Sequence, residues 1–86
     1  MMPFTQKQIS TTMFSRTFDT LINEDELKWH FDEKDRTVSV LQNHDWQIQF
    51  DNCLPVLLEG VIQIPKNTYH RIIRGTGNLK VLISET

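Results

Sequence analysis

The chain has 86 residues, 38% of them hydrophobic, which suits one small domain whose folding buries about two thirds of its unfolded surface. Its net charge of -2, without a basic block or an apolar run near the ~20 residues of a membrane helix, argues against nucleic-acid and membrane partners. The first residues lack the layout of a signal peptide, and the single Cys53 has no partner for an internal disulfide, so we expect a cytoplasmic protein.

The N-terminal part divides into an arm and a first strand. Residues 1–11 are polar and are expected to form an arm that is either disordered or paired with the edge of a sheet, while residues 12–86 form the folded domain. Residues 13–18 alternate between two faces, which predicts a strand. One of these faces carries Phe14, Arg16 and Phe18. The acidic residues 23–26 then predict a turn, or alternatively one turn of helix within residues 21–29.

Residues 27–32 alternate again and predict a second strand. Successive side chains of a strand point to opposite faces, so His30 and Asp32 leave the same face. Trp29 and Phe31 leave the other face, and we expect Trp29 to pack in the core. Strand alternation alone therefore places a histidine and a carboxylate side by side.

Two further strands are predicted at residues 37–41, which are rich in β-branched side chains, and at residues 46–50, which alternate most clearly. An apolar face of the second is shared by Trp46, Ile48 and Phe50. Two arrangements stay open. If this face packs inward, Gln49 faces solvent; if it packs outward, Gln49 lines a pocket and hydrogen-bonds a ligand.

The rest of the chain continues the strand pattern. Strands are predicted at residues 54–58, 61–64, 69–73 and 79–83. The last two are joined by a turn in which Gly75 and Gly77 are expected to supply positive φ. About eight short strands separated by turn signals predict an all-β fold, a small antiparallel β-barrel whose interior holds one ligand.

The stretch from Gly60 to His70 joins a strand, a tight turn and a histidine. Pro65 ends the strand because it has no backbone donor, and Asn67 tolerates the positive φ of a tight turn. Glycine, four residues, proline, and histidine five residues later is a pattern that resembles the second motif of the cupin superfamily, although Asn67 stands where glycine is commonest. The resemblance implies a small antiparallel barrel, here a cupin-like jelly roll, with His70 pointing inward to bind a divalent metal.

Residues 29–41 resemble the first cupin motif less closely. Asp32 replaces its second histidine, Arg36 or Thr37 stands where a glutamate is expected, and both framing glycines are missing. An arginine cannot ligate a metal, so three ligands remain. Cupins include dioxygenases, isomerases, sugar-binding modules and metal-free storage proteins, and the resemblance therefore implies a fold and a site without fixing a reaction.

The candidate metal ligands are His30, Asp32 and His70. Two histidines and a carboxylate form a facial triad that leaves coordination positions open and suits Fe(II), with zinc, manganese and nickel as competitors. We expect a divalent metal ion, no organic cofactor, and a small polar molecule as the ligand, with an oxygenase-type reaction as one outcome and catalysis itself left open. The alternative is a metal-free ligand-binding or assembly module in which Asp32 forms an ion pair with Arg36.

The candidate ligand-binding residues are Arg36, Gln49, Tyr69 and Arg74. Tyr69 is expected either in the core or as a stacking wall at the barrel mouth, and Arg74, which shares strand parity with His70, would bind an anionic group. A homodimer through residues 13–18 would cover an open sheet edge. Small cupins of this kind are encoded by bacteria and their phages, so the resemblance also implies phage encoding as one possibility.

Overall fold

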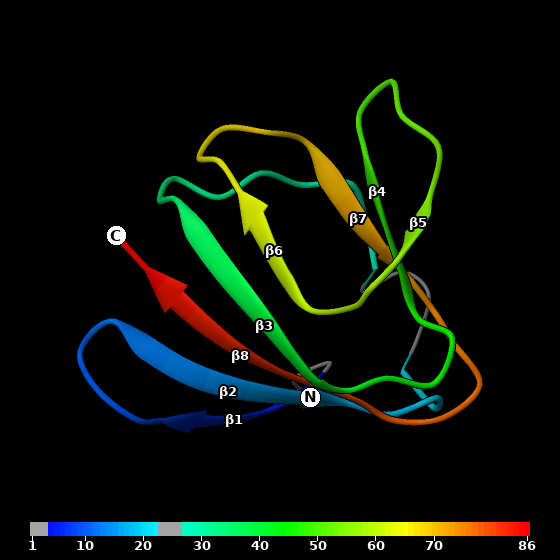
Figure 1. The fold of residues 1–86 in the computed structure, drawn as a ribbon, viewed down its shortest axis with the longest axis horizontal. Coiled ribbons are helices and arrows are strands. Elements are labelled where there is room, and N and C mark those ends of the chain that lie inside the picture. Colours follow the sequence, from blue (N-terminus) through cyan, green and yellow to red (C-terminus); the bar gives the residue numbers. More distant parts are fainter. Residues whose placement is uncertain (1–3, 23–26) are drawn as a thin grey trace.

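Eight strands in two antiparallel sheets surround one core in the computed structural model (Figure 1), which describes residues 4–22 and 27–86. The strands are β1 (Thr5–Gln8), β2 (Met13–Phe18), β3 (Arg36–Gln42), β4 (Gln47–Phe50), β5 (Val56–Leu57), β6 (Val61–Ile64), β7 (His70–Ile73) and β8 (Leu79–Glu85). The larger sheet has the order β1-β2-β8-β3-β6 and the smaller has the order β5-β4-β7. No helix in this part of the chain could cross a membrane.

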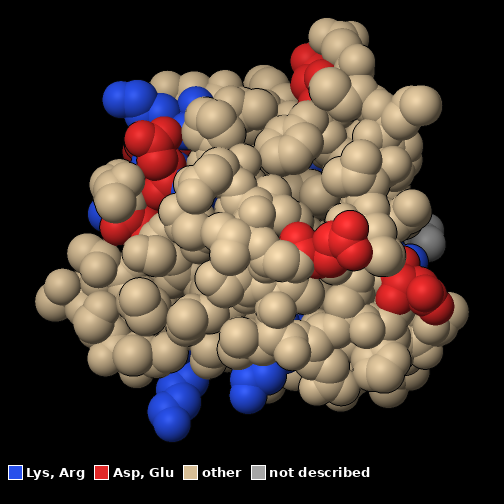
Figure 2. Space-filling model, in the orientation of Figure 1, with Lys and Arg blue, Asp and Glu red and all other residues tan. Residues whose placement is uncertain are grey.

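The predicted all-β antiparallel fold is confirmed, but the barrel is not closed. Among the described strands no ladder joins the two sheets, so they pack as two layers of a jelly roll. The turn between β6 and β7 carries the chain from the larger sheet to the smaller, and Asn67 in this turn has the expected positive φ, 60°. Basic and acidic side chains are interspersed on the face shown in Figure 2, with uncharged surface between them.

The core fixes which face of each strand points inward. β2 pairs with β8 over its whole length, and Phe14 and Phe18 from β2 are both buried. Trp46 and Ile48 are fully buried on the opposite layer, at 0% and 1% exposure. The apolar face of residues 46–50 therefore packs inward, which is one of the two arrangements that alternation left open.

The predicted strand at residues 27–32 does not form as a ladder. Only His30 pairs, in an isolated bridge with His70. The outer side of this segment faces solvent: Trp29 is 41% exposed, and Phe31 stacks edge-on against Tyr69, which is 49% exposed. The expectation that Trp29 and Tyr69 pack in the core is therefore wrong, because this segment and the start of β7 have no further layer of described chain outside them. The predicted turn or helix at residues 23–26 lies outside the described residues.

The arm and the first strand form one antiparallel pair. Thr5–Gln8 pairs with β2, and β8 flanks β2 on its other side. Both edges of Met13–Phe18 are therefore occupied, so a second copy cannot add a strand directly to β2. Among the strands of the larger sheet, β1 and β6 are the edges.

The turn before β8 needs its glycines for a different reason from the one expected. Gly60 is the one described glycine with positive φ, at 65°, so the expected positive φ at Gly75 and Gly77 is wrong. Both glycines instead allow close packing. Thr76 donates its backbone N–H to the His44 carbonyl at 2.8 Å, and Trp46 donates its Nε1–H to the Gly77 carbonyl at 2.6 Å. A Cβ on Gly75 would overlap the His44 carbonyl and the Trp46 backbone.

We predict that Gly75→Ala lowers the free energy of unfolding by about 1–3 kcal/mol, because the added methyl forces apart backbone segments that are already in contact. Urea unfolding followed by tryptophan fluorescence measures the change. Asn78→Ala, at an exposed position of the same turn, is the control and is expected to change stability by less than about 0.5 kcal/mol. Equal stabilities of the two variants would contradict the packing role of Gly75.

Candidate metal centre

His70 is the buried histidine of the site, with 3% of its surface exposed. It begins β7, directly after the turn that changes sheets. Its Nδ1 lies 2.8 Å from the Thr68 carbonyl oxygen. A carbonyl only accepts hydrogen bonds, so Nδ1 carries the proton and donates it, and Nε2 keeps its lone pair. The turn thus sets both the position of the ring and its tautomer.

His30 repeats this local arrangement from the other side of the bridge. Its Nδ1 lies 2.8 Å from the Lys28 carbonyl oxygen, which again leaves the Nε2 lone pair available. The backbone N–H of His30 donates to the His70 carbonyl at 3.0 Å, and that of His70 donates to the His30 carbonyl at 2.9 Å. The two imidazole rings consequently sit with their centroids 4.4 Å apart. A hydrogen-bonded Nδ1 with a free Nε2 is the usual state of a metal-binding histidine.

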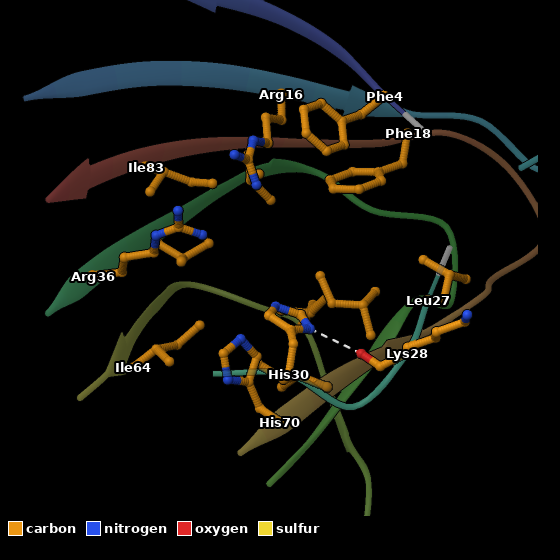
Figure 3. Close-up of a pocket in the computed structure, with 15 residues that line it drawn as sticks. Phe4, Arg16, Phe18, Leu27, Lys28, His30, Arg36, Ile64, His70 and Ile83 are labelled. Carbon is orange, nitrogen blue, oxygen red and sulfur yellow. Dashed lines mark hydrogen bonds between the residues drawn. The ribbon is translucent and has the colours of Figure 1, made fainter. Parts of the chain in front are cut away.

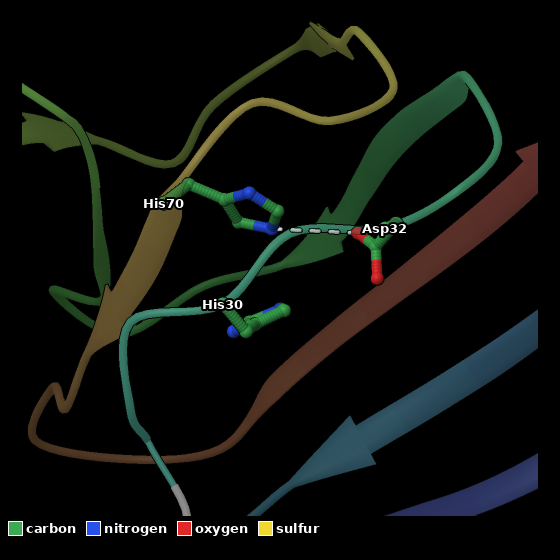
Figure 4. Close-up of side chains that lie close together, drawn as sticks. All are labelled: His30, Asp32 and His70. Carbon is green, nitrogen blue, oxygen red and sulfur yellow. Dashed lines mark ion pairs between the residues drawn. The ribbon is translucent and has the colours of Figure 1, made fainter.

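Asp32 completes the cluster, which Figure 4 shows. One of its oxygens, Oδ2, lies 3.5 Å from His70 Nε2 and 3.4 Å from Arg36 Nη1. One ring nitrogen of each histidine and one carboxylate oxygen all lie within 4.8 Å of one another. Asp32 Oδ2 is buried and has no hydrogen-bond partner among the described residues. A buried carboxylate oxygen that receives no hydrogen bond is costly, and a further cation beside Arg36 would offset this cost.

The electrostatics of His70 fit the same conclusion. Burial lowers its pKa below the usual 6.5, and the neighbouring His30 and Arg36 lower it further, while the Thr68 hydrogen bond and Asp32 act in the opposite direction. Neutral His70, with its Nδ1–H on Thr68, points a lone pair at Asp32 Oδ2. Two acceptors 3.5 Å apart repel unless a cation lies between them. The donor set therefore fits a divalent metal ion.

A cavity of about 400 Å³ opens beside the cluster (Figure 3). His30 and His70 lie on one side of it, and Arg16 and Arg36 enter it from β2 and β3. The rest of the lining is mainly apolar and includes Phe18, Ile48, Ile64 and Val81. Ligand pockets of this kind combine apolar walls with a few converging polar groups.

The four expected ligand-binding residues divide into one that lines this cavity and three that do not. Arg36 lines it, with its Nε donating to Glu85 Oε2 at 2.9 Å. Gln49 lies on the outer face of β4, where it accepts a hydrogen bond from Arg71. Tyr69 packs against Phe31 on the surface, and Arg74 donates to the Ile22 carbonyl. The structure thus brings together the three metal-ligand candidates and Arg36.

Arg16 is a cavity residue that reasoning from the sequence missed. It lies between Phe14 and Phe18 on the inward face of β2, so its side chain enters the interior. The signal was present in the sequence, because an arginine on an otherwise aromatic inward face needs a buried partner or a ligand.

No protein-family model and no curated protein sequence matches the chain. Among solved structures, a chain of the DMSP lyases RdDddP and RnDddQII has a TM-score of 0.70 and 16% identity, over 85% of this chain and 36% of that one. FeII HppE has a TM-score of 0.67 and 15% identity, over 86% of this chain and 41% of that one. An RmlC-like cupin protein from Desulfovibrio desulfuricans has a TM-score of 0.65 and 22% identity, over 96% and 81%.

The fold implied by the stretch from Gly60 to His70 is confirmed by these structures. The chain has the fold of an RmlC-like cupin. At identities of 15–22% the similarity concerns the fold alone. The chain spans 36% of the DMSP lyase chain and 41% of the HppE chain.

We predict that acid destabilises the metal-free protein through His70. Its pKa is depressed in the folded chain and returns to about 6.5 on unfolding, so the unfolded state binds the proton more readily. The contribution of His70 to stability is therefore complete above pH 6.5 and is lost as the pH falls through the folded pKa. Urea unfolding in the presence of a chelator, from about pH 8 to pH 5, measures this dependence.

His70→Asn and His44→Asn form the matched pair for this measurement. His44 is exposed in the turn before β4, so replacing it is expected to leave the wild-type pH dependence intact. His70→Asn removes the buried titrating group and is expected to give a shallower dependence. An unchanged slope in His70→Asn would contradict the role assigned to burial.

Proposed function

We propose that this protein holds a divalent metal ion through His30, Asp32 and His70, and presents it to a small polar molecule in the adjoining cavity. The observation that carries the proposal is Asp32 Oδ2, which is buried, has no hydrogen-bond donor, and lies 3.5 Å from His70 Nε2. A ligand set of two imidazoles and one carboxylate suits Fe(II), zinc, manganese or nickel.

The residues around the ligands prepare the site for such an ion. The Lys28 and Thr68 carbonyls hold both imidazoles in one tautomer, so little reorganisation is needed on binding. The apolar walls limit access of water, and Arg36, whose positive charge repels a metal ion, is itself hydrogen-bonded to Glu85. A bound divalent metal supplies a Lewis acid that polarises an oxygen of the ligand or lowers the pKa of water. An oxygenase-type reaction is the finer form of this proposal, supported by the open positions of a three-ligand set.

The structural neighbours support the proposal at the level of the fold. One of them is described as FeII HppE and another as DMSP lyases, so the same fold occurs in an iron protein and in lyases. This chain corresponds to one part of those longer chains.

The alternative, a metal-free binding or assembly module, has one observation in its favour. Arg36 Nη1 lies 3.4 Å from Asp32 Oδ2, which is within ion-pair distance. The stronger contact of Arg36 is with Glu85, however, where Nε and Oε2 are 2.9 Å apart and hydrogen-bonded. Arg36 therefore has a partner without Asp32, whereas the Asp32 oxygen has no hydrogen bond from Arg36. This asymmetry favours the metal site over the ion pair.

We predict about one divalent metal ion per chain in protein purified without an affinity tag, because the three ligands are already positioned. Elemental analysis by plasma mass spectrometry identifies the metal and its amount. His30→Gln and His70→Ala are expected to lower metal affinity by about tenfold or more, since each removes a ligand. His44→Gln replaces an exposed histidine away from the cluster and is the control. A metal-free wild type, or full occupancy in His70→Ala, would contradict the proposal.

We also predict opposite effects of Asp32→Asn on binding and on stability. The variant loses metal affinity, but in chelator-treated protein its free energy of unfolding is equal to or above that of the wild type. The reason is that a neutral amide removes a buried carboxylate charge that has no donor. The ion-pair alternative requires the reverse, a loss of about 1–3 kcal/mol in the same chelated protein. Urea unfolding of both chelated proteins decides between the two.

Three expectations about the surroundings of the protein stay predictions: its location in the cytoplasm, its encoding by a phage, and its assembly as a homodimer. Because β1 pairs with β2, a second copy would add to the larger sheet at one of its edge strands, β1 or β6. Sedimentation velocity of the full chain measures the oligomeric state.

A further inference from the structure

Arg16 is a cation in the cavity whose charge is not matched by the described residues. It lies in the middle of β2, between Gln6 of β1 and Val81 of β8 in the sheet. Its Nε donates to Gln6 Oε1 at 2.9 Å. Within residues 4–22 and 27–86 no carboxylate lies within ion-pair distance of it, and no acceptor meets the N–H groups on Nη1 and Nη2.

The surroundings of Arg16 are aromatic and partly shield it from water. Its guanidinium carbon lies 4.1 Å from the ring centroid of Phe4 and 4.9 Å from that of Phe14, so it is within cation–π distance of two aromatic rings. Burial, and next the charge of Arg36, lower the pKa of Arg16 to about 10, while the more distant carboxylates of Asp32 and Glu85 act in the opposite direction, and Arg16 is still charged near neutral pH. Stacking on aromatic rings stabilises the guanidinium plane, but it does not satisfy the N–H groups at the edge.

Arg36, which also lines this cavity, differs from Arg16 because it has carboxylate partners. Its guanidinium carbon lies 5.7 Å from the centroid of the same Phe14 ring, and two carboxylates, Asp32 and Glu85, lie within ion-pair distance of it. In Figure 3 the head groups of Arg16 and Arg36 point toward each other across the upper part of the cavity. Two guanidinium groups therefore face one space, and only one of them is paired.

We propose that Arg16 binds the oxyanion group of a small molecule whose apolar part fills the cavity. The edge of a guanidinium presents parallel N–H groups that match the two oxygens of a carboxylate or a phosphonate. The walls beyond it are apolar, including Phe18, Ile48 and Val81, so the remainder of the ligand is a short hydrocarbon body. This inference deepens the proposed function by naming the class of ligand. It rests on the proposed metal site only for the end of the ligand away from the oxyanion, which meets His30 and His70.

The test uses the full chain after chelator treatment, so that oxyanion binding is measured without any metal. Hexanoate, hexylphosphonate and the neutral hexanamide are titrated by isothermal calorimetry. We expect at least one of the two anions to bind about tenfold or more tightly than hexanamide, because charge-assisted hydrogen bonds to the anion exceed those to a neutral amide. The better of the two anions identifies the oxyanion. Equal affinity for all three, or no binding of either anion, would overturn the proposal.

Variants locate the effect at Arg16. Arg16→Met keeps an apolar side chain of comparable length and is expected to lose about tenfold or more in affinity for the anion, with hexanamide unaffected. Arg71→Met removes an arginine that lies outside the cavity, against Trp29 and Gln49, and is expected to bind the anion as the wild type does. Wild-type anion affinity in folded Arg16→Met would overturn the assignment.

A measurement on the wild type covers the case in which Arg16→Met does not fold. The Arg16 Nε–H resonance in a nitrogen-15 spectrum is expected to shift with the better-binding anion and not with hexanamide, and an unshifted resonance at saturation would overturn the proposal. The metal site is tested separately, because the metal content of folded Arg16→Met is expected to equal that of the wild type. A chain that holds no metal as purified but binds the anion contradicts only the proposed metal function, and one that holds metal as purified but does not bind the anion contradicts only the assignment of Arg16.

Discussion

Two backbone hydrogen bonds, from His30 to His70 at 3.0 Å and from His70 to His30 at 2.9 Å, hold the segment before β3 against the smaller sheet. Because they join the two histidines themselves, they fix the separation of the imidazoles at 4.4 Å between ring centroids. A third bond, from Asn67 N–H to the Asp32 carbonyl at 2.7 Å, ties the next part of the segment to the turn before β7. The ligand cluster is thus positioned mainly by the backbone.

The alternation of side chains along a strand correctly predicted on which side of the extended chain a residue lies. It placed Trp46 and Ile48 on one face, and the core packs around that face. It also placed His30 and Asp32 on the same side. They do converge, although their segment pairs at one residue instead of forming a ladder, because a short extended backbone has the same alternation with or without partners.

Alternation could not predict where a ladder ends or which surface has another layer over it. Arg74 shares parity with His70, but β7 ends at Ile73, and beyond that point the arginine turns to the Ile22 carbonyl. Trp29 and Tyr69 were expected inside from their size, yet no described layer covers their side of the smaller sheet. Arg16 was overlooked for another reason: alternation placed it on one face with Phe14 and Phe18, but its charge was not weighed against these aromatic residues.

The cavity and the core share the same side chains, which explains why a domain this small carries unsatisfied groups. Phe18, Ile48, Leu58 and Val81 belong to the core cluster and also line the cavity, so the space lies in the middle of the only core that the described residues form. Arg16, which lines the cavity, forms no ion pair among the described residues, and Asp32, beside the histidines that line it, receives no hydrogen bond on Oδ2. Arg36 lies between the two, contacting Asp32 and lowering the pKa of Arg16. A cation bound at Asp32 would weaken the attraction between that carboxylate and Arg36. The electrostatic potential at Arg16 would then become more positive, and an anion would bind there more tightly. The metal site at Asp32 and the anion site at Arg16 are therefore coupled through Arg36, since a cation bound at the first strengthens anion binding at the second.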